Sequence, residues 1–299
     1  MRRWLFVAMV GCGRLDFATR VDDASPNPDR APDALHLCDP TAPFGTPVQV
    51  AGVNDPVAYD STFVPTIDEL TAYFYSDRAG DYDLYAATRP DLASAWTVRH
   101  IDELASAGEE KEPSLSPDGT VLAFTSDRTP DAGGDDLWYA TYDGAHFTIG
   151  GPIAIFDTTA TDYHPTFQDA SDQFWFSSNV GGTFSIYHAT HNGGGSFGPA
   201  TLENDLDDAG TDSGAATPSA DGLTMYFRSD RNAAVGDYDI YVARRFSTSD
   251  VFGPATAVTE VNSSSLDTPN WISPDGCRLY LSSSRDDASN VYVATKQAN

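Results

Sequence analysis

The chain has 299 residues, of which 44 are Asp or Glu and 17 are Lys or Arg, for a formal charge of −27. Such an acidic surface would repel a phosphate backbone, which argues against nucleic-acid binding. Aromatic residues make up 12% of the chain, which argues against wholesale disorder. No apolar run reaches the roughly 18 residues that a membrane-spanning helix needs.

The first residues resemble a bacterial lipoprotein signal, which we assign to 1–12. Arg2 and Arg3 form a basic start, a short apolar stretch follows, and Met9-Val10-Gly11-Cys12 resembles a lipobox, whose cysteine becomes lipidated. Several acyl chains on Cys12 would anchor the protein firmly. The alternative is a misplaced start, with Cys12 buried in the fold. Residues 13–37 are rich in Asp, Pro, Ala and Arg, and we expect a flexible tether.

The rest of the chain repeats one pattern five times. Its most visible marker is an aromatic strand that ends in Ser-Asp-Arg or a relative of it. The aligned serines are residues 76, 126, 177, 229 and 283. An Asp-containing turn precedes each marker, at Asp68, Asp118, Asp169, Asp221 and Asp275. A short β-rich strand follows the marker, and then a segment led by an aromatic residue, at Phe44, Trp96, Phe147, Phe197 and Phe252.

Each unit therefore contains four short strands separated by Gly, Asp, Ser and Pro, which is typical of a propeller blade. We name these strands A to D from the axis outwards. The chain begins with a D segment at 44–53 and ends after a C segment, so the N-terminal strand is expected to complete the last blade. The prediction for 38–299 is an all-β fold, a single five-bladed β-propeller with four antiparallel strands per blade.

These repeats resemble the WD40-like PD40 repeats of the TolB type. The resemblance rests on Pro-Ser-Leu-Ser-Pro-Asp-Gly at 113–119 with Leu-Ala-Phe-Thr-Ser-Asp-Arg at 122–128, and it covers about 44–296. It implies a propeller that often serves as a protein-binding platform in the bacterial envelope, although a fold does not fix a function. TolB has six blades and a further domain, so its translocation role is not carried over to five repeats.

The cysteines fit this closure. If Cys12 is lipidated, Cys38 and Cys277 remain as a pair. Cys38 precedes the closing D segment and Cys277 follows the A–B turn of the same blade, and both points lie at one end of a four-strand meander. A disulfide between them would fasten the ring in an oxidising compartment, the periplasm or the outer membrane. Two unrelated buried thiols are the alternative.

An acidic residue recurs near the start of each predicted strand A. The five residues are Asp60, Glu110, Asp162, Asp212 and Asp267. Because strand A lines the axis, they would form a ring at one channel mouth, with Glu112 and His164 close by. Antiparallel pairing would bring the marker arginines towards the acids, namely Arg78, Arg128, Arg231 and Arg285. The pattern fits structural acid–arginine pairs, a mouth for a cation or basic partner, or catalytic carboxylates.

Chemical motifs are sparse. The sequence contains no His-Glu-x-x-His and no glycine-rich phosphate loop that opens a helix. Five-bladed glycosidases use inward carboxylates, yet acids that are equivalent by repeat argue against separate acid and base roles. Asp-rich B–C loops at 77–83, 127–136 and 230–239 could hold Ca²⁺, but their spacing is irregular and favours turn chemistry.

We therefore expect no cofactor and no catalytic residue. The favoured interpretation is a monomeric, lipid-anchored envelope protein that binds an envelope protein or a polysaccharide through the face of its D–A and B–C loops. A secreted enzyme resembling five-bladed glycoside hydrolases is the alternative.

Overall fold

The computed structural model describes residues 38–39, 41–129, 134–154, 159–231 and 235–297. Residues 37–299 make up one compact unit. The predicted signal at 1–12 with its Cys12, and the predicted tether at 13–37, lie outside the described residues. Within the described ranges all named elements are strands, and no helix there is long and apolar enough to cross a membrane.

Twenty strands of the described residues form five four-stranded antiparallel sheets. Blade 1 contains β2 (Asp60–Pro65), β3 (Thr71–Ser76), β4 (Asp83–Thr88) and β5 (Thr97–His100). Blade 2 contains β6 (Glu110–Leu115), β7 (Val121–Ser126), β8 (Asp136–Tyr142) and β9 (Phe147–Pro152). Blade 3 contains β10 (Asp162–Phe167), β11 (Gln173–Ser178), β12 (Ser185–Thr190) and β13 (Thr201–Leu202). Blade 4 contains β14 (Ser213–Pro218), β15 (Thr224–Ser229), β16 (Asp239–Arg244) and β17 (Thr256–Ala257). Blade 5 contains β18 (Asp267–Ile272), β19 (Arg278–Asp286), β20 (Ala288–Thr295) and β1 (Val48–Gln49).

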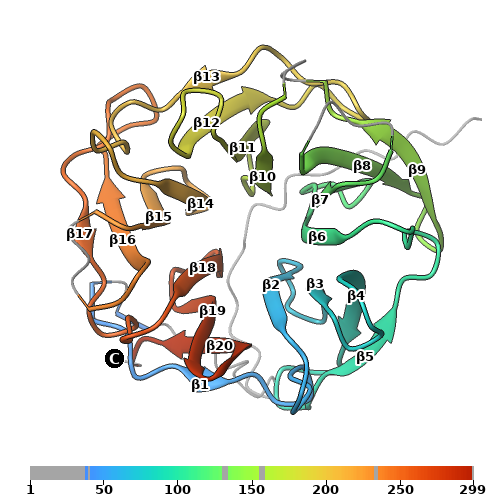
Figure 1. Cartoon of the computed structure of the whole chain (residues 1–299). Coiled ribbons are helices and arrows are strands. Elements are labelled where there is room, and N and C mark those ends of the chain that lie inside the picture. The colour runs from blue at the N-terminus through green and yellow to red at the C-terminus, as the bar shows by residue number, and fades with distance from the viewer. Residues whose placement is uncertain (1–37, 40, 130–133, 155–158, 232–234, 298–299) are drawn as a thin grey trace, which may run out of the picture. The chain divides into compact units, whose positions relative to one another are not determined.

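The five sheets are arranged around one axis (Figure 1). Each innermost strand contacts the innermost strand of the next blade, and β18 of the last blade contacts β2 of the first. This arrangement confirms the predicted five-bladed β-propeller. We call the end that carries the D–A and B–C loops the loop face, and the end that carries the A–B and C–D turns the turn face.

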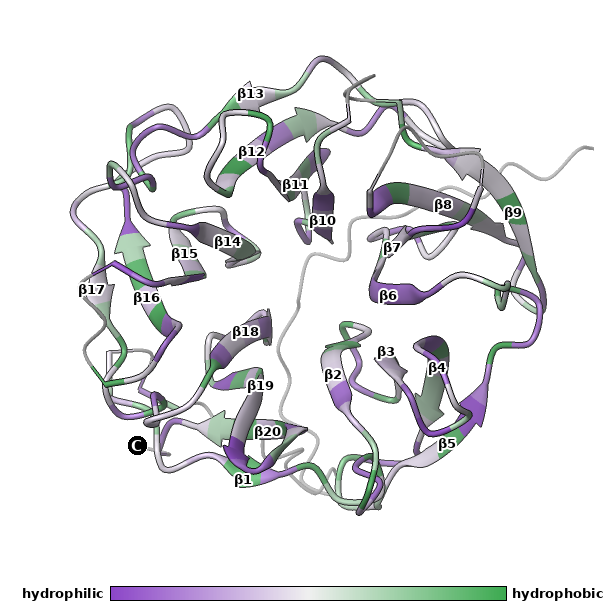
Figure 2. Cartoon of the chain, viewed as in Figure 1, coloured by the Kyte–Doolittle hydropathy of each residue, from purple (hydrophilic) through white to green (hydrophobic). Residues whose placement is uncertain are grey.

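The blades pack through one repeated position on strand B, two residues before the serine that ends it. Its occupants are Phe74, Phe124, Phe176, Phe227 and Leu281, and all are fully buried. Each buried aromatic side chain removes enough apolar surface from water to contribute about 2–3 kcal/mol. Figure 2 shows the complementary polarity, since innermost β6 is largely hydrophilic while β4 and β16 are hydrophobic over much of their length.

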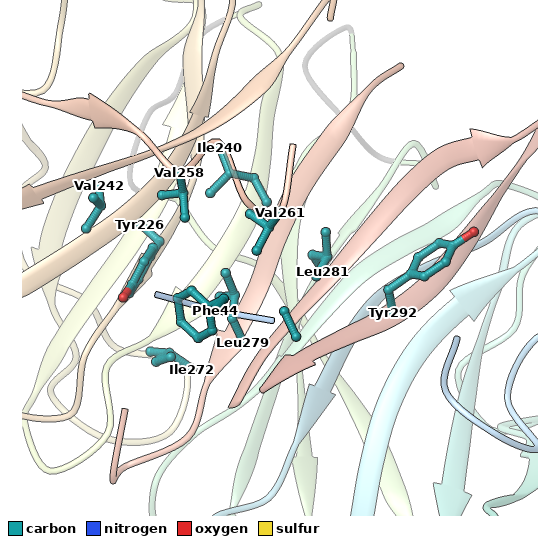
Figure 3. Close-up of a cluster of buried hydrophobic side chains, with 11 residues drawn as sticks. Phe44, Tyr226, Ile240, Val242, Val258, Val261, Ile272, Leu279, Leu281 and Tyr292 are labelled. Carbon is teal, nitrogen blue, oxygen red and sulfur yellow. The ribbon is translucent and has the colours of Figure 1, made fainter. Parts of the chain in front are cut away.

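The N-terminal strand closes the ring, as the order of the repeats predicts. β1 pairs with β20 through Val48 and Val293, and Phe44 forms a further bridge to Lys296. Figure 3 shows the Phe44 ring among buried side chains of blades 4 and 5, with the Tyr226 ring 6.1 Å away. Hydrogen bonds and apolar packing therefore both hold the two ends of the chain together.

A disulfide between Cys38 and Cys277 joins the same two ends. Its Cα atoms are 5.8 Å apart, and the two residues are separated by 239 positions in the sequence. Because a cross-link between distant residues restricts the unfolded chain, this bond stabilises the closed ring.

Replacing both cysteines, as Cys38→Ser with Cys277→Ser, is expected to lower the free energy of unfolding by about 2–4 kcal/mol. Urea unfolding of the double variant and of the native chain, both under oxidising conditions, measures the difference. The native chain treated with reductant should match the variant. An unchanged unfolding midpoint in the variant would show that strand pairing alone closes the ring.

Candidate functional site

The Ser-Asp-Arg motif holds three segments of the chain together at the loop face. In blade 1, Arg78 Nη2 forms an ion pair with Asp60 and donates to the carbonyl oxygen of Val53 at 2.8 Å. Its Nε donates to Ser76 Oγ at 2.9 Å, and the guanidinium lies 5.1 Å from the Tyr85 ring centre. We call this arrangement, in which the motif arginine joins the start of strand A, the D–A loop and the end of strand B, the arginine clamp.

The arginine clamp recurs in three more blades. Arg128 pairs with Glu110 at 2.9 Å, and Arg285 pairs with Asp267 at 2.7 Å. Each also donates to a D–A loop carbonyl, that of Leu104 or Val261 respectively. Asp60, Glu110 and Asp267 are 0% exposed, so these three predicted acids are buried ion-pair partners. Their carboxylates are compensated by arginine rather than offered to a ligand.

Blade 4 corrects the alignment of the fourth acid. The residue that pairs with the end of strand B is Ser213, opposite Ser229, and Asp212 precedes it by one position. Arg231 accordingly donates to Ser213 Oγ at 2.9 Å and not to Asp212. The Asp212 carboxylate instead accepts from the backbone N–H of Phe184 at 2.9 Å and from Tyr238 Oη at 3.0 Å.

Blade 3 keeps the acid but lacks the arginine. Asp162 pairs with Ser178, so the motif serine is one residue later than the sequence alignment places it, and Val180 occupies the arginine position. Asp162 is only 6% exposed, and its Oδ1 has no hydrogen-bond partner among the described residues. Burial raises the pKa of Asp162 to about 6, although Ser178 donates to the carboxylate and opposes the shift.

Supplying the missing cation is therefore expected to stabilise blade 3. The backbone N–H of Val180 already bonds to Ser178 Oγ at 3.3 Å, as Arg78 N bonds to Ser76 Oγ at 3.2 Å, so the backbone at this position matches that of the arginine clamps. Val180→Arg should raise the free energy of unfolding by about 1.5 kcal/mol through a charge-assisted hydrogen bond. Thermal unfolding at neutral pH measures it, with Val180→Gln as the uncharged control. Equal midpoints for the two variants would contradict the assignment.

The raised pKa of Asp162 also predicts a pH dependence. Because the pKa is about 6 in the folded chain and 3.8 in the unfolded chain, the folded state binds the extra proton between these values. Stability is therefore lost as pH rises from about 4 to about 6, and the cost stays constant above that range. Asp162→Asn should unfold at a higher temperature than the native chain at about pH 7, and the gap should vanish near pH 4. A gap that is independent of pH would argue against this carboxyl as its source.

A bulge interrupts strand A where it approaches the axis. The third residue has a left-handed backbone in four blades, at Thr62, Glu112, His164 and Ala215, and the strand register shifts there. The bulge turns backbone N–H groups towards the neighbouring blade. His164 N donates to Glu112 Oε2 at 2.7 Å, and Ala215 N donates to Ser177 Oγ at 3.1 Å. These contacts join adjacent blades next to the axis.

Glu112 and His164 are brought together by this geometry. His164 Nε2 lies 3.1 Å from Glu112 Oε1, and Thr125 Oγ1 donates to Glu112 Oε2 at 2.8 Å. Burial raises the pKa of Glu112 and lowers the pKa of His164 well below its usual value. Both side chains are buried. The pair therefore binds blade 2 to blade 3, with the imidazole neutral.

Half-buried aromatic and charged side chains gather on the loop face, and we call them the loop-face cluster. Its members are Tyr59, Tyr82, Tyr163, Phe184, Asp212, Arg228 and Tyr238. The Arg228 guanidinium lies 5.3 Å from the Tyr163 ring centre and 5.1 Å from that of Tyr238, and it donates to Tyr163 Oη at 2.9 Å. The Tyr163 and Phe184 rings are 4.4 Å apart.

Sequence reasoning missed most of this cluster. Three members directly precede strand C of their blades, namely Tyr82, Phe184 and Tyr238. This repeated position could have predicted the cluster from the sequence, because an aromatic residue at the end of a B–C loop lies outside the core between blades.

Aspartates of the B–C loops accept hydrogen bonds from backbone N–H groups. Asp77, Asp127 and Asp230 each accept the N–H of the residue before strand A, at 2.7, 2.7 and 2.8 Å. Among the residues that the structure describes, no three His, Cys, Asp or Glu side chains are grouped to bind a metal. The carboxylates of Asp77, Asp127 and Asp230 therefore hold the start of strand A against the end of strand B.

One sequence pattern, Gly-x-Ser-x-Gly at 194–198, resembles the elbow that presents a nucleophilic serine. It lies in the exposed turn between β12 and β13, where Asn192 N bonds to the Ser196 carbonyl. A nucleophile elbow instead joins a strand to a helix. The pattern is a hairpin turn in this fold.

A scan of protein-family models found no match, and no curated protein matches in sequence. Among solved structures, the chain is similar to TolB from Acinetobacter baumannii, with 18% identity, a TM-score of 0.51, and coverage of 80% of this chain and 55% of TolB. It is also similar to Zg3597, a family 117 glycoside hydrolase of Zobellia galactanivorans, with 10% identity, a TM-score of 0.57, and coverage of 87% and 91%. A glycosyl hydrolase from Bacteroides ovatus has 14% identity, a TM-score of 0.55, and coverage of 86% and 96%.

These similarities establish the class of the chain, a β-propeller with a TolB-like fold. The chain spans about half the length of the TolB that it matches. Glycoside hydrolases share the same architecture over most of their own length. Both the binding and the hydrolytic interpretations are therefore compatible with the fold.

Proposed function

We propose that the protein is a non-enzymatic binding platform of the bacterial envelope, and that a protein or glycan ligand docks on its loop-face cluster. The observation that carries this proposal is the contrast between two sets of polar groups at the same face. Three of the predicted acids are locked in arginine clamps, whereas Arg228, Asp212 and the aromatic rings around them are half-buried.

The chemistry of the loop-face cluster suits a ligand with flat apolar faces and polar edges. Tyr rings present such faces and keep a hydroxyl that bonds to water or ligand. Arg228 is held between Tyr163 and Tyr238, and this preorganisation lowers the entropy lost on binding. Sugar rings and aromatic or aliphatic protein side chains both fit this description.

Hydrolysis is the second candidate, and the similarity to glycoside hydrolases over nearly their full length favours it. Glycoside hydrolysis needs two carboxyl groups that both face the scissile bond. In this chain Asp60, Glu110 and Asp267 face arginines, and Glu112 faces His164 and Thr125. These four carboxyl groups face protein side chains and not an open site, which favours binding over cleavage.

The envelope location rests on two features. The Cys38–Cys277 disulfide is compatible with an oxidising, extracytoplasmic compartment. The lipobox-like sequence at Cys12 supplies the anchor, and labelling of the native chain but not of a Cys12→Ser variant by a fatty-acid probe tests it.

Tyr238→Ala is expected to weaken ligand binding about tenfold or more, because it removes a ring contact and the hydroxyl that fixes Asp212. The measurement is a glycan array and a panel of purified envelope proteins, screened with the native chain and the variant. Phe246→Ala is the matched control, because Phe246 is 99% exposed and lies in a C–D turn of the same blade.

The same polysaccharides are assayed for released reducing ends. Cleavage of any of these polysaccharides by the native chain would contradict the binding-platform proposal and support hydrolysis. Equal loss of binding in Tyr238→Ala and Phe246→Ala would contradict the assignment of the ligand site to the loop face.

A further inference from the structure

A cavity of about 350 Å³ lies at the opposite end of the axis, on the turn face. Residues at the ends of the innermost strands and in the A–B turns of blades 1, 2 and 3 line it, together with Trp271 of blade 5. Its walls include Val64, Leu115 and Phe167. The volume falls within the range of small-ligand sites, roughly 300–1,000 Å³. We call it the turn-face pocket.

The charges of the turn-face pocket have one sign. Its lining includes Asp68, Asp118 and Asp169, and no lysine, arginine or histidine. Hydrogen bonds from Thr66 and Ser116 lower the pKa of Asp68 and of Asp118, so both are ionised at neutral pH. An apolar cavity with an anionic rim favours a ligand that carries a positive charge on an apolar stem.

Asp169 departs from the repeat at this place. In the other blades the turn aspartate accepts from a hydroxyl two residues before it, as Asp118 does from Ser116 and Asp275 from Ser273. The bond from Gln168 N to the Gln173 carbonyl is equivalent to the bond from Ser116 N to the Val121 carbonyl. Ala170 of blade 3 is therefore equivalent to Asp118 of blade 2, and Asp169 is equivalent to Pro117. Asp169 does lie in the turn, but one position earlier than Asp118 lies in its own turn. Its carboxyl lines the pocket instead.

Trp271 is the partner of Asp169 across the pocket. Both side chains line the pocket, and hydrogen bonding from the Trp271 side chain, whose single donor is the indole N–H, opposes the effect of burial on the pKa of Asp169. Trp271 comes from blade 5 and Asp169 from blade 3, so the contact joins two blades that are not neighbours in the ring. Burial raises the pKa of Asp169, which reflects a carboxyl without a compensating cation.

The chain itself shows what such a pair binds. In the arginine clamp of blade 2, the Arg128 guanidinium contacts the Glu110 carboxylate at 2.9 Å and lies 5.4 Å from the Trp138 ring centre. The same two groups, a carboxylate and an indole, line the turn-face pocket. We infer that the turn-face pocket binds the arginine side chain of a partner polypeptide, with the guanidinium bonded to the Asp169 carboxylate and stacked on the Trp271 indole, and with the apolar stem against Phe167.

This inference goes beyond the proposed function, since it concerns the opposite face and a different ligand group. Lysine would satisfy the charge, but a planar guanidinium both stacks on an indole and bonds a carboxylate through two donors. The pocket therefore selects arginine over lysine and over the neutral isostere citrulline.

The indole N–H of Trp271 reports occupancy directly, because a guanidinium would compete for its Asp169 acceptor. We would titrate the full chain at about pH 8 with acetyl-Gly-Arg-Gly-amide and follow the indole resonances by ¹H–¹⁵N NMR. The Trp271 signal is identified by its loss in Trp271→Phe. We expect it to shift in a saturable way with the arginine peptide, and to shift far less with the citrulline peptide.

Asp169→Asn should weaken the arginine peptide about tenfold, the change expected when one charge-assisted contact is lost. Asp172→Asn is the matched control, since Asp172 lies in the same turn, is exposed, and does not line the pocket. An unmoved Trp271 signal, equal affinity for the citrulline peptide, or equal weakening in both variants would overturn the inference. Tyr238→Ala should leave the titration unchanged, so failure here is separable from failure of the loop-face proposal.

Discussion

The arginine clamp is the interaction on which the rest of the ring depends, because one guanidinium fixes three chain segments at once. A buried carboxylate alone would be costly, since taking a charge out of water costs several kcal/mol. The guanidinium offsets that cost with donors to the carboxylate, to a D–A loop carbonyl and to the motif serine, and an aromatic ring covers it. Blades 1, 2, 4 and 5 are thereby each joined to the loop that leads into them.

The acidity of the sequence takes on a different meaning in this light. Part of the acidity lies in clamps, where an arginine neutralises each of the carboxylates of Asp60, Glu110 and Asp267. Another part lies in turns, where Asp77, Asp118 and their equivalents accept backbone or hydroxyl hydrogen bonds. Asp212 on one face and Asp169 on the other belong to neither group: their carboxylates accept from Tyr238 and Trp271 and have no arginine partner among the residues that the structure describes.

The fold could be predicted from the sequence because its signals are local and repeated. The Ser-Asp-Arg marker, the turn aspartates and the order of the four strands each recur about every 50 residues, so five copies average out single deviations. The site could be predicted only in part. A bulge changes which residues of strand A face which neighbour, and it occurs at Thr62, Glu112 and His164, where no glycine marks the left-handed backbone.

The same bulges and loops explain the errors of one position. Counting from a turn aspartate placed Asp212 at the head of strand A, whereas Ser213 pairs with Ser229. Blade 3 has a turn of altered register, so Ser177 and Asp169 were each aligned with the wrong equivalents. The loop-face cluster escaped prediction for another reason: its contacts join blades 3 and 4, and single-repeat patterns contain no information on neighbours in space.

Closure by β1 has a consequence for the order of events during synthesis. Val48 is made before any blade is complete and its partner Val293 only with the third strand of blade 5, so β1 stays unpaired until that strand has been made. Blades 1 to 4 can assemble from contacts within about 50 residues, whereas the joint between β1 and β20 spans all five blades. The propeller therefore reaches its native form as a last, long-range step, and a chain truncated before β20 would leave two exposed strand edges prone to aggregation.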